Sequence, residues 1–263
     1  MLFDTHAHYD SEAFDADRDQ VLAGLPEKGV GLVLCPGSDL SSSRACMTLA
    51  ETYPHVYAAA GVHPQEAGAL RPGWETALCR YLAHPKVKAV GEIGLDYYYI
   101  NAPRAVQQAV FRTQMELAKE FRLPVIVHDR DAHHDSMEIV RAYPQVTGVF
   151  HCYSGGVEDA KELVKRGWML SFTGTITFKN ARKAPQVITE IPLEHLMIET
   201  DAPYMAPTPF RGRRCDSGYV YRMAETIAAL KGLPVEEVAR ITTENGKRFF
   251  NIEGVMCHDD DHL

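Results

Sequence analysis

Short hydrophobic runs alternate along the chain with longer amphipathic stretches, and the alternation repeats about eight times. The runs are nearly continuous in Val, Ile, Leu and Phe, which is typical of parallel strands that are buried on both faces. We therefore predict strands within eight segments: 2–6, 30–37, 56–64, 87–96, 124–130, 147–155, 167–174 and 195–203.

Helical stretches lie between these hydrophobic runs. In "PRAVQQAVFRTQMELAKEFRL", at 103–123, most apolar residues recur at the helical period, and Pro103 suits a helix start. The segments 158–167 and 219–233 have the same character, and the first of them ends in a glycine. Each helical stretch is expected to connect two neighbouring strands.

Alternating strands and helices imply βαβ units with right-handed crossovers and a parallel sheet. Eight such units in about 250 residues match the size of a closed α/β barrel, the (β/α)8 or TIM barrel. We therefore predict a single barrel domain over residues 1–252, followed by a polar, acidic tail at 253–263 that is expected to be disordered. A doubly wound open sheet is the alternative, because one miscounted strand would change the topology.

Composition narrows the classes of function. The 263 residues include 46% hydrophobic residues, which is ordinary for a globular protein, and the net charge of −8 argues against wrapping duplex DNA by bulk electrostatics. The six cysteines form no C-x-x-C pair and are expected to be reduced thiols. With no signal peptide and no long apolar stretch, we expect a cytoplasmic protein without membrane contact.

Side chains that can bind metals gather at the ends of the predicted strands. A barrel collects the carboxyl ends of all its strands on one face, where enzymes of this fold build their sites. Residues far apart in sequence should therefore meet there. The polar residues at these ends are His6, His8, His63, Glu92, Asp96, His128, Asp129, His151, Glu199 and Asp201.

Six of these residues form the candidate metal site. His6 and His8 project to the same side of an extended chain and can converge on one ion. The Glu92 carboxylate would be costly to bury alone, so cations should lie beside it, and its two oxygens allow it to bridge two metals. Imidazoles mixed with carboxylates favour zinc, manganese, iron or nickel. The six are His6, His8, Glu92, His128, His151 and Asp201.

Other polar residues near these strand ends have two interpretations each. Glu199 shares a strand face with Asp201 and could be a ligand, an acid or a support for a ligand. His63 could contact substrate or cap its loop. His133 and His134 are expected at a solvated helix start. Acidic residues beside the ligands could orient imidazoles or belong to ordinary turns: Asp4, Asp96 and Asp129.

Two loops on the same face carry candidate substrate-binding residues. Tyr97 lies in "DYYY" and could stack on a nucleobase, although packing of the loop explains it equally well. The segment "PFRGRRCDS", at 209–217, follows the last strand and suggests a phosphate clamp, with a solvated surface loop as the alternative. Its three arginines are Arg211, Arg213 and Arg214.

The order of the motifs resembles a known family. "DTHAHYD", "GVHP", "GEIGLDYYY", "PVIVHDRDA", "HCYSG", "ETDAPYMAP" and "ENGKRFF" follow one another as in the TatD-type metal-dependent deoxyribonucleases of the amidohydrolase superfamily. The resemblance extends over about residues 1–252. It implies a (β/α)8 barrel and a two-metal hydrolase acting on DNA, often described as a 3′ exonuclease.

The resemblance also implies a role for each ligand. His6 and His8 would hold one ion, and His128 and His151 would hold the other. Glu92 would bridge the pair. Asp201 would bind the first ion and accept a proton from the attacking water, so Glu92 and Asp201 are the predicted catalytic residues.

We therefore expect a deoxyribonuclease with two divalent ions per chain, with Zn, Mn, Ni or Mg as candidates. The expected substrate is single-stranded DNA or DNA ends, cleaved as a 3′–5′ exonuclease by a monomer. One alternative is hydrolysis of a small amide, ester or lactone by the same binuclear centre. Another is a metal-bearing barrel that binds nucleic acid without chemistry, against which the full set of ligands argues.

Overall fold

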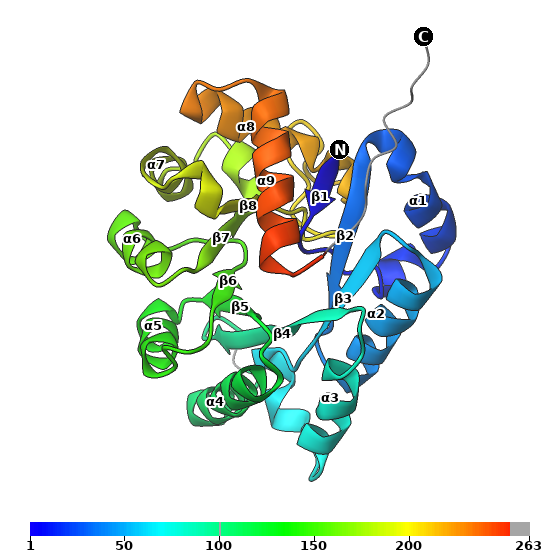
Figure 1. The fold of residues 1–263 in the computed structure, drawn as a ribbon, viewed down its shortest axis with the longest axis vertical. Coiled ribbons are helices and arrows are strands. Elements are labelled where there is room, and N and C mark those ends of the chain that lie inside the picture. The colour runs from blue at the N-terminus through cyan, green and yellow to red at the C-terminus, as the bar shows by residue number, and fades with distance from the viewer. Residues whose placement is uncertain (100, 253–263) are drawn as a thin grey trace.

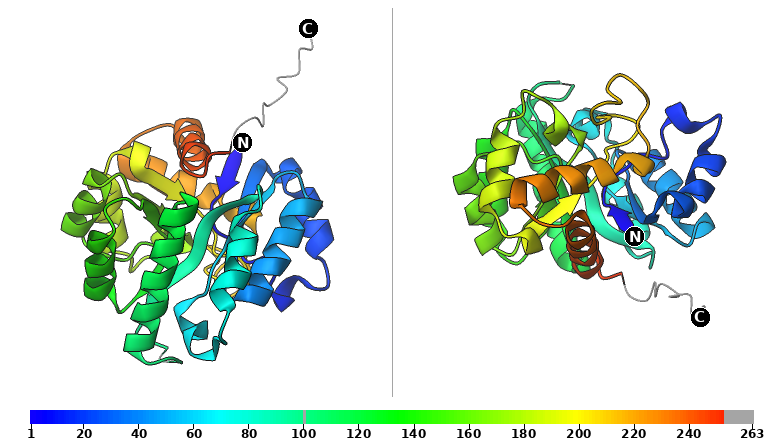
Figure 2. Two further views of the ribbon diagram at one scale, coloured as in Figure 1. Left: turned by 60° about the horizontal axis from the view of Figure 1, so that its bottom comes forward. Right: turned by 90° about the horizontal axis from the view of Figure 1, so that it is seen from above.

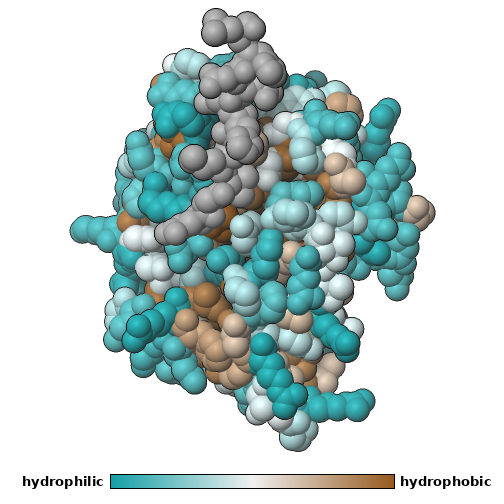
Figure 3. Space-filling model, turned by 45° about the vertical axis from the view of Figure 1, so that its right-hand side comes forward, coloured by the Kyte–Doolittle hydropathy of each residue, from teal (hydrophilic) through white to brown (hydrophobic). Residues whose placement is uncertain are grey.

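A computed structural model describes residues 1–99 and 101–252 of the chain (Figure 1). The tail at 253–263, for which we predict disorder, lies outside the described residues. Among the described residues, no helix is long and apolar enough to cross a membrane. Figure 3 shows a face that is covered mostly by hydrophilic side chains, with smaller hydrophobic patches between them.

Eight parallel strands form one sheet in sequential order, from β1 to β8. The sheet curls into a nearly closed barrel with the helices outside it (Figures 1 and 2), which confirms the predicted TIM barrel and excludes the open sheet. The strands are β1 Leu2–Asp4, β2 Val30–Pro36, β3 Val56–Ala60, β4 Val87–Asp96, β5 Val125–Arg130, β6 Gly148–Phe150, β7 Met169–Phe172 and β8 Leu196–Ile198.

The helices follow the strands and cover the barrel. The stretches predicted at 103–123, 158–167 and 219–233 form α4, α6 and α8, each slightly shorter than its hydrophobic pattern. The helices of the described chain are α1 Arg18–Gly24, α2 Leu40–Thr52, α3 Trp74–Leu82, α4 Arg104–Phe121, α5 His133–Ala142, α6 Val157–Lys165, α7 Lys183–Glu190, α8 Tyr221–Lys231 and α9 Val235–Phe249.

Side chains from every strand fill the inside of the barrel, so the interior is a packed core and not a pore. Phe250 and Ile252, just after α9, join this core, and the Phe250 ring packs edge-on against Phe3 with centroids 6.1 Å apart. The carboxyl end of α9 therefore helps to close the barrel at the amino ends of the strands. The interior residues on the strands are Phe3, Leu32, Leu34, Ala59, Ala89, Ile126, Val149, Met169 and Met197.

The barrel closes where β1 meets β8, and polar contacts supply much of this seam. The Asp201 N–H donates to the His6 carbonyl at 2.9 Å, and the His8 N–H donates to the Ala202 carbonyl at 2.7 Å. The fully buried Asp4 carboxylate accepts the Thr200 N–H at 2.8 Å and the Thr200 hydroxyl at 2.5 Å. The seam thus sets His6 and His8 directly beside Asp201.

Removing the Thr200 hydroxyl tests whether the seam stabilises the barrel. Thr200→Val removes the hydroxyl that donates to the buried Asp4 carboxylate and accepts the Ala202 N–H, so we expect a loss of about 1–3 kcal/mol in the free energy of unfolding, measured by urea denaturation. The matched control is Thr113→Val, because the Thr113 hydroxyl bonds only to Ala109 one turn earlier on the outside of α4. Equal stability of the two variants would contradict a stabilising role for this hydrogen bond.

Candidate metal centre

The six predicted metal ligands converge at the carboxyl ends of the strands. The short strands β1, β6 and β8 end before their ligands, so the ligands lie in the first residues of the following loops. Barrel closure still brings the ligands together, because each of these loops begins at the carboxyl end of its strand, and these ends lie at the same end of the barrel. The converging residues are His6, His8, Glu92, His128, His151 and Asp201.

The first group of donor atoms comes from β1, β4 and β8. The Nε2 atoms of His6 and His8 lie 3.2 Å apart, and they lie 3.4 and 3.5 Å from Glu92 Oε2. Asp201 Oδ1 lies 3.8 Å from His6 Nε2 and 3.5 Å from His8 Nε2. Two imidazoles and two carboxylates therefore present one donor atom each to a common point.

The second group uses the other oxygen of the same carboxylate. Glu92 Oε1 lies 2.9 Å from His128 Nδ1 and 2.9 Å from His151 Nε2. The two imidazole nitrogens are 3.3 Å apart. Glu92 is thus the one side chain that belongs to both groups.

The spacing within both groups fits the requirements of bound divalent cations. Bonds of about 2.0–2.1 Å to nitrogen and oxygen place neighbouring ligand atoms about 2.9–3.4 Å apart in tetrahedral or octahedral geometry. The observed separations, 2.9–3.8 Å, lie in or near this range. Mixed imidazole and carboxylate donors suit zinc, manganese or nickel. The residues present therefore fit a metal.

Two glycines allow Glu92 to reach the centre of the barrel. A Cβ on Gly91 would lie 2.7 Å from the Ile126 side chain, and one on Gly94 would lie 2.0 Å from the His128 carbonyl oxygen. Gly94 also has a φ of +136°, which side chains rarely tolerate. The pattern "GEIG" therefore lets β4 approach β5 closely on both sides of the carboxylate.

Electrostatics keep the carboxylates ionised. Burial alone would raise the pKa of Glu92, but the imidazoles of His151 and His6 and further ring contacts hold this pKa well below its usual range. Burial also acts against ionisation of Asp201, and the hydrogen bond with His8 helps to lower its pKa. Two ionised carboxylates among these imidazoles favour cation binding.

Two acidic side chains support the second group of ligands. Asp96 Oδ2 lies 3.2 Å from His128 Nε2, on the far side of the ring from Glu92, and it accepts a hydrogen bond from Gln65 at 2.9 Å. Glu199 Oε1 lies 3.3 Å from His151 Nδ1 and accepts the Cys152 N–H at 2.6 Å. Carboxylates in such positions orient imidazoles and raise their basicity.

His63 lies at the edge of the cluster, where it serves as both loop cap and neighbour of the ligands. Its Nδ1 accepts the Gln65 N–H at 3.2 Å, and its Nε2 lies 3.8 Å from Glu92 Oε1. Burial and the neighbouring His128 lower the pKa of His63 to about 3. A neutral ring with Nδ1 as acceptor carries its proton on Nε2, so it faces the cluster as a hydrogen-bond donor.

The other predicted substrate-binding residues differ in whether the fold already engages their side chains. Tyr97 is buried and donates its hydroxyl to Asp135 at 2.6 Å, which matches the loop-packing alternative. Arg214 forms a bidentate pair with Asp17 at 2.6 and 2.7 Å. Arg211 is exposed with its guanidinium 4.1 Å from the centre of the Phe178 ring, and Arg213 is exposed as well.

The remaining polar residues fall into clear roles. His133 and His134 begin α5, as predicted, and the His134 side chain is 82% exposed, whereas that of His133 is 29% exposed and lies between Asp129 and Asp159. Asp129 therefore orients His133 and not a ligand, and Asp4 belongs to the seam. Sequence reasoning missed Gln65 and Ser171, which hold Asp96 and Glu199; single polar residues of this kind carry no recognisable spacing.

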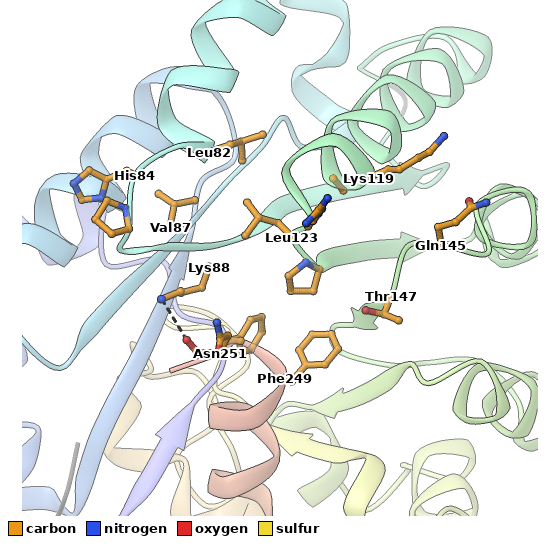
Figure 4. Close-up of a pocket in the computed structure, with 15 residues that line it drawn as sticks. Leu82, His84, Val87, Lys88, Lys119, Leu123, Gln145, Thr147, Phe249 and Asn251 are labelled. Carbon is orange, nitrogen blue, oxygen red and sulfur yellow. Dashed lines mark hydrogen bonds between the residues drawn. The ribbon is translucent and has the colours of Figure 1, made fainter. Parts of the chain in front are cut away.

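A cavity of about 650 Å³ lies at the opposite end of the barrel (Figure 4). It is lined by Val87 and Lys88 at the start of β4, by Leu123 after α4 and by Phe249 and Asn251 at the end of α9. Lys88 donates a hydrogen bond to the Asn251 carbonyl at 3.3 Å. None of the converging metal ligands lines this cavity.

Comparison with known proteins agrees with the site. The family model described as "TatD related DNase" matches residues 3–251. The chain is 43% identical to the "Uncharacterized metal-dependent hydrolase YabD" of Bacillus subtilis, covering 96% of this chain and 100% of that one. It is 30% identical to the "3'-5' ssDNA/RNA exonuclease TatD" of Salmonella typhimurium, covering 95% and 99%. The crystal structure of the TatD homologue YJJV from Escherichia coli superposes with a TM-score of 0.90 at 32% identity, covering 96% and 98%.

A parallel barrel with clustered imidazoles and carboxylates at the carboxyl ends of its strands defines a metal-dependent hydrolase. The family match and the relatives give the same class for nearly the whole chain. The chain belongs to the TatD family.

The role of Glu199 can be tested by changing its charge. Glu199→Gln removes the negative charge beside His151 Nδ1, so we expect metal affinity to fall about 10- to 100-fold while the number of ions at saturation stays unchanged. Isothermal titration calorimetry measures both quantities. The exposed Glu194, five residues earlier, provides the matched control Glu194→Gln. Loss of one whole ion at saturating metal would instead make Glu199 a ligand.

Proposed function

We propose that this hydrolase is a nuclease that removes nucleotides from the ends of single-stranded DNA with two divalent ions per chain. The observation that carries the proposal is the division of the donor atoms into two groups that share only Glu92, one on each of its oxygens. Two ions held in this way are the usual means of hydrolysing phosphodiesters. The relative named as a 3′–5′ ssDNA/RNA exonuclease supports the same class of substrate.

The ligands divide into two sets in this proposal. His6, His8 and Asp201 would hold one ion, His128 and His151 the other, and Glu92 would bridge them. When bound, the ions lower the pKa of water and neutralise phosphate charge. Zn, Mn, Ni and Mg are the candidate ions.

The side chains around the centre would carry out the remaining steps. Asp201 lies 3.5 Å from His8 at the mouth of the site, and its ionised carboxylate would accept the proton of the attacking water. His63 would donate from Nε2 to a phosphate oxygen. Arg211 and Arg213 would bind neighbouring phosphates from the loop after β8. A monomer located in the cytoplasm remains our prediction.

Activity on labelled DNA tests this function. We expect the protein to degrade 3′-labelled and 5′-labelled single strands with Mn²⁺, Mg²⁺, Zn²⁺ or Ni²⁺, and a chelator should abolish the degradation. Because loss of a support for a ligand already costs about 10- to 100-fold, His128→Ala should cost at least about 100-fold. The matched control is His134→Ala, whose ring is 82% exposed.

The outcome of the same assay separates the alternatives. If the labelled DNA stays uncut with every metal and the protein hydrolyses a lactone or ester, the function is that of a small-molecule hydrolase. DNA binding without cleavage of either substrate would leave a binding protein.

The three arginines are expected to act differently. Arg211→Ala combined with Arg213→Ala should weaken DNA binding and reduce the slope of log affinity against log salt by about 1–2, since about one phosphate contact is lost per residue. Arg214→Ala should leave this slope unchanged but lower the thermal midpoint, because Asp17 loses its partner. Fluorescence anisotropy over a salt series and a melting curve distinguish these effects. An equal change of slope in all variants would contradict the assignment.

A further inference from the structure

Two exposed tyrosines lie beside the metal centre and are not used to build the core. Tyr98 is 57% exposed and Tyr99 is 48% exposed. Their rings meet edge to face, with centroids 4.7 Å apart and planes at 86°. The guanidinium of Arg130, the last residue of β5, lies 4.2 Å from the centre of the Tyr98 ring and 4.9 Å from that of Tyr99.

The tyrosines are fixed to the metal centre by one carboxylate. Asp96 Oδ1 accepts the N–H groups of Tyr98 and Tyr99 at 2.9 and 2.8 Å, while Oδ2 lies 3.2 Å from His128 Nε2. Gln107 binds the backbone of Asp96 from α4, with both contacts at 2.9 Å. The aromatic pair therefore has a defined position relative to His128.

Tyr97, the residue before this pair, already anchors the loop to the rest of the fold. The Tyr97 hydroxyl is held by Asp135 and by Gln108, and the Arg104 guanidinium lies 4.2 Å from the centre of its ring. Packing thus accounts for Tyr97 but not for two large rings left open to solvent next to it. Exposed aromatic rings at the rim of a site are surfaces for a ligand.

We propose that Tyr98, Tyr99 and Arg130 form a stacking platform for unpaired nucleobases of the strand being cut. This inference rests on the proposed nuclease function and names the part of the substrate that is recognised. Aromatic rings and the arginine plane stack on the π-face of any base, so the platform needs no particular sequence. Bases inside a duplex are already stacked, so the platform selects single strands and frayed ends.

Arg130 adds charge to this surface. Arg130 is exposed and its guanidinium lies over the two rings, so its N–H groups can also bind a phosphate or a base edge. Arg211 and Arg213 lie on the loop after β8, and the strand order puts β8 across the barrel from β4. The metal centre lies between an aromatic rim on β4 and β5 and a basic rim after β8. A strand crossing the site would then place bases on one rim and phosphates on the other.

The test compares normal and abasic strands. Binding of a fluorescein-labelled oligothymidylate and of an abasic strand of equal length is measured by anisotropy with chelator present, where no cleavage occurs. Wild-type protein should bind the thymidylate more tightly than the abasic strand. Tyr98→Ala combined with Tyr99→Ala should reduce the affinity for the thymidylate about ten-fold or more and leave the affinity for the abasic strand unchanged. Tyr98→Phe with Tyr99→Phe keeps the rings and should restore the preference.

Tyr57→Ala is the matched control. This ring also has a cation over it, Lys86 at 4.2 Å from its centroid, but it lies near the amino end of β3, at the other end of the barrel. The variant should bind both strands as wild type does. Melting curves confirm that each variant is folded.

Each outcome decides the inference separately from the nuclease proposal. Equal affinity of wild type and the alanine variant for the thymidylate overturns the platform, including the case in which neither binds. With metal, the platform predicts a higher KM for thymidylate and no change for abasic ends in the alanine variant. Failure of the wild type to cleave any strand overturns the nuclease instead, while the binding comparison still judges the platform.

Discussion

The burial of one carboxylate, that of Glu92, is the constraint on which the rest of the site depends. A buried negative charge is costly unless cations surround it. In this barrel imidazoles meet that requirement, with His6 and His8 beside one oxygen and His128 and His151 beside the other. Glycines on both sides let β4 carry the group inward. Burial of Glu92 therefore ties the packing of β4 against β5 to the geometry of the metal centre.

The seam between β1 and β8 converts barrel closure into ligand geometry. His6 and His8 come from the first ten residues and Asp201 from the last quarter of the chain, yet across the seam the Asp201 N–H donates to the His6 carbonyl and the His8 N–H donates to the Ala202 carbonyl. The hydrogen bonds from Thr200 to the buried Asp4 carboxylate also fix the register of the segment after β8 relative to β1. A shift of one residue would turn the donor atoms to the opposite face. Closing the barrel consequently brings three of the four donors of the first group together, and β4 supplies the fourth, Glu92.

Much of the fold and the ligand set could be predicted from sequence, because both depend on short local patterns. Continuous apolar runs mark buried parallel strands, and the candidate metal ligands in or just beyond five of these eight runs are visible without coordinates. The strand ends were less accurate: β6 covers only Gly148–Phe150 of the predicted 147–155. Long-range partners could not be foreseen. Asp17 lies 197 residues before Arg214, so nothing in "PFRGRR" distinguishes this arginine from Arg213.

In the tyrosine loop, one motif contains both a buried ring and two exposed rings. In "DYYY" the three rings are identical in sequence, but β4 ends at Asp96, and in the bend that follows Tyr97 is buried whereas Tyr98 and Tyr99 are exposed. Asp96 serves both sides, because one oxygen faces a metal ligand and the other holds the exposed pair. In the proposed platform, Asp96 would therefore link the contact between a base and the two rings to the orientation of the His128 imidazole.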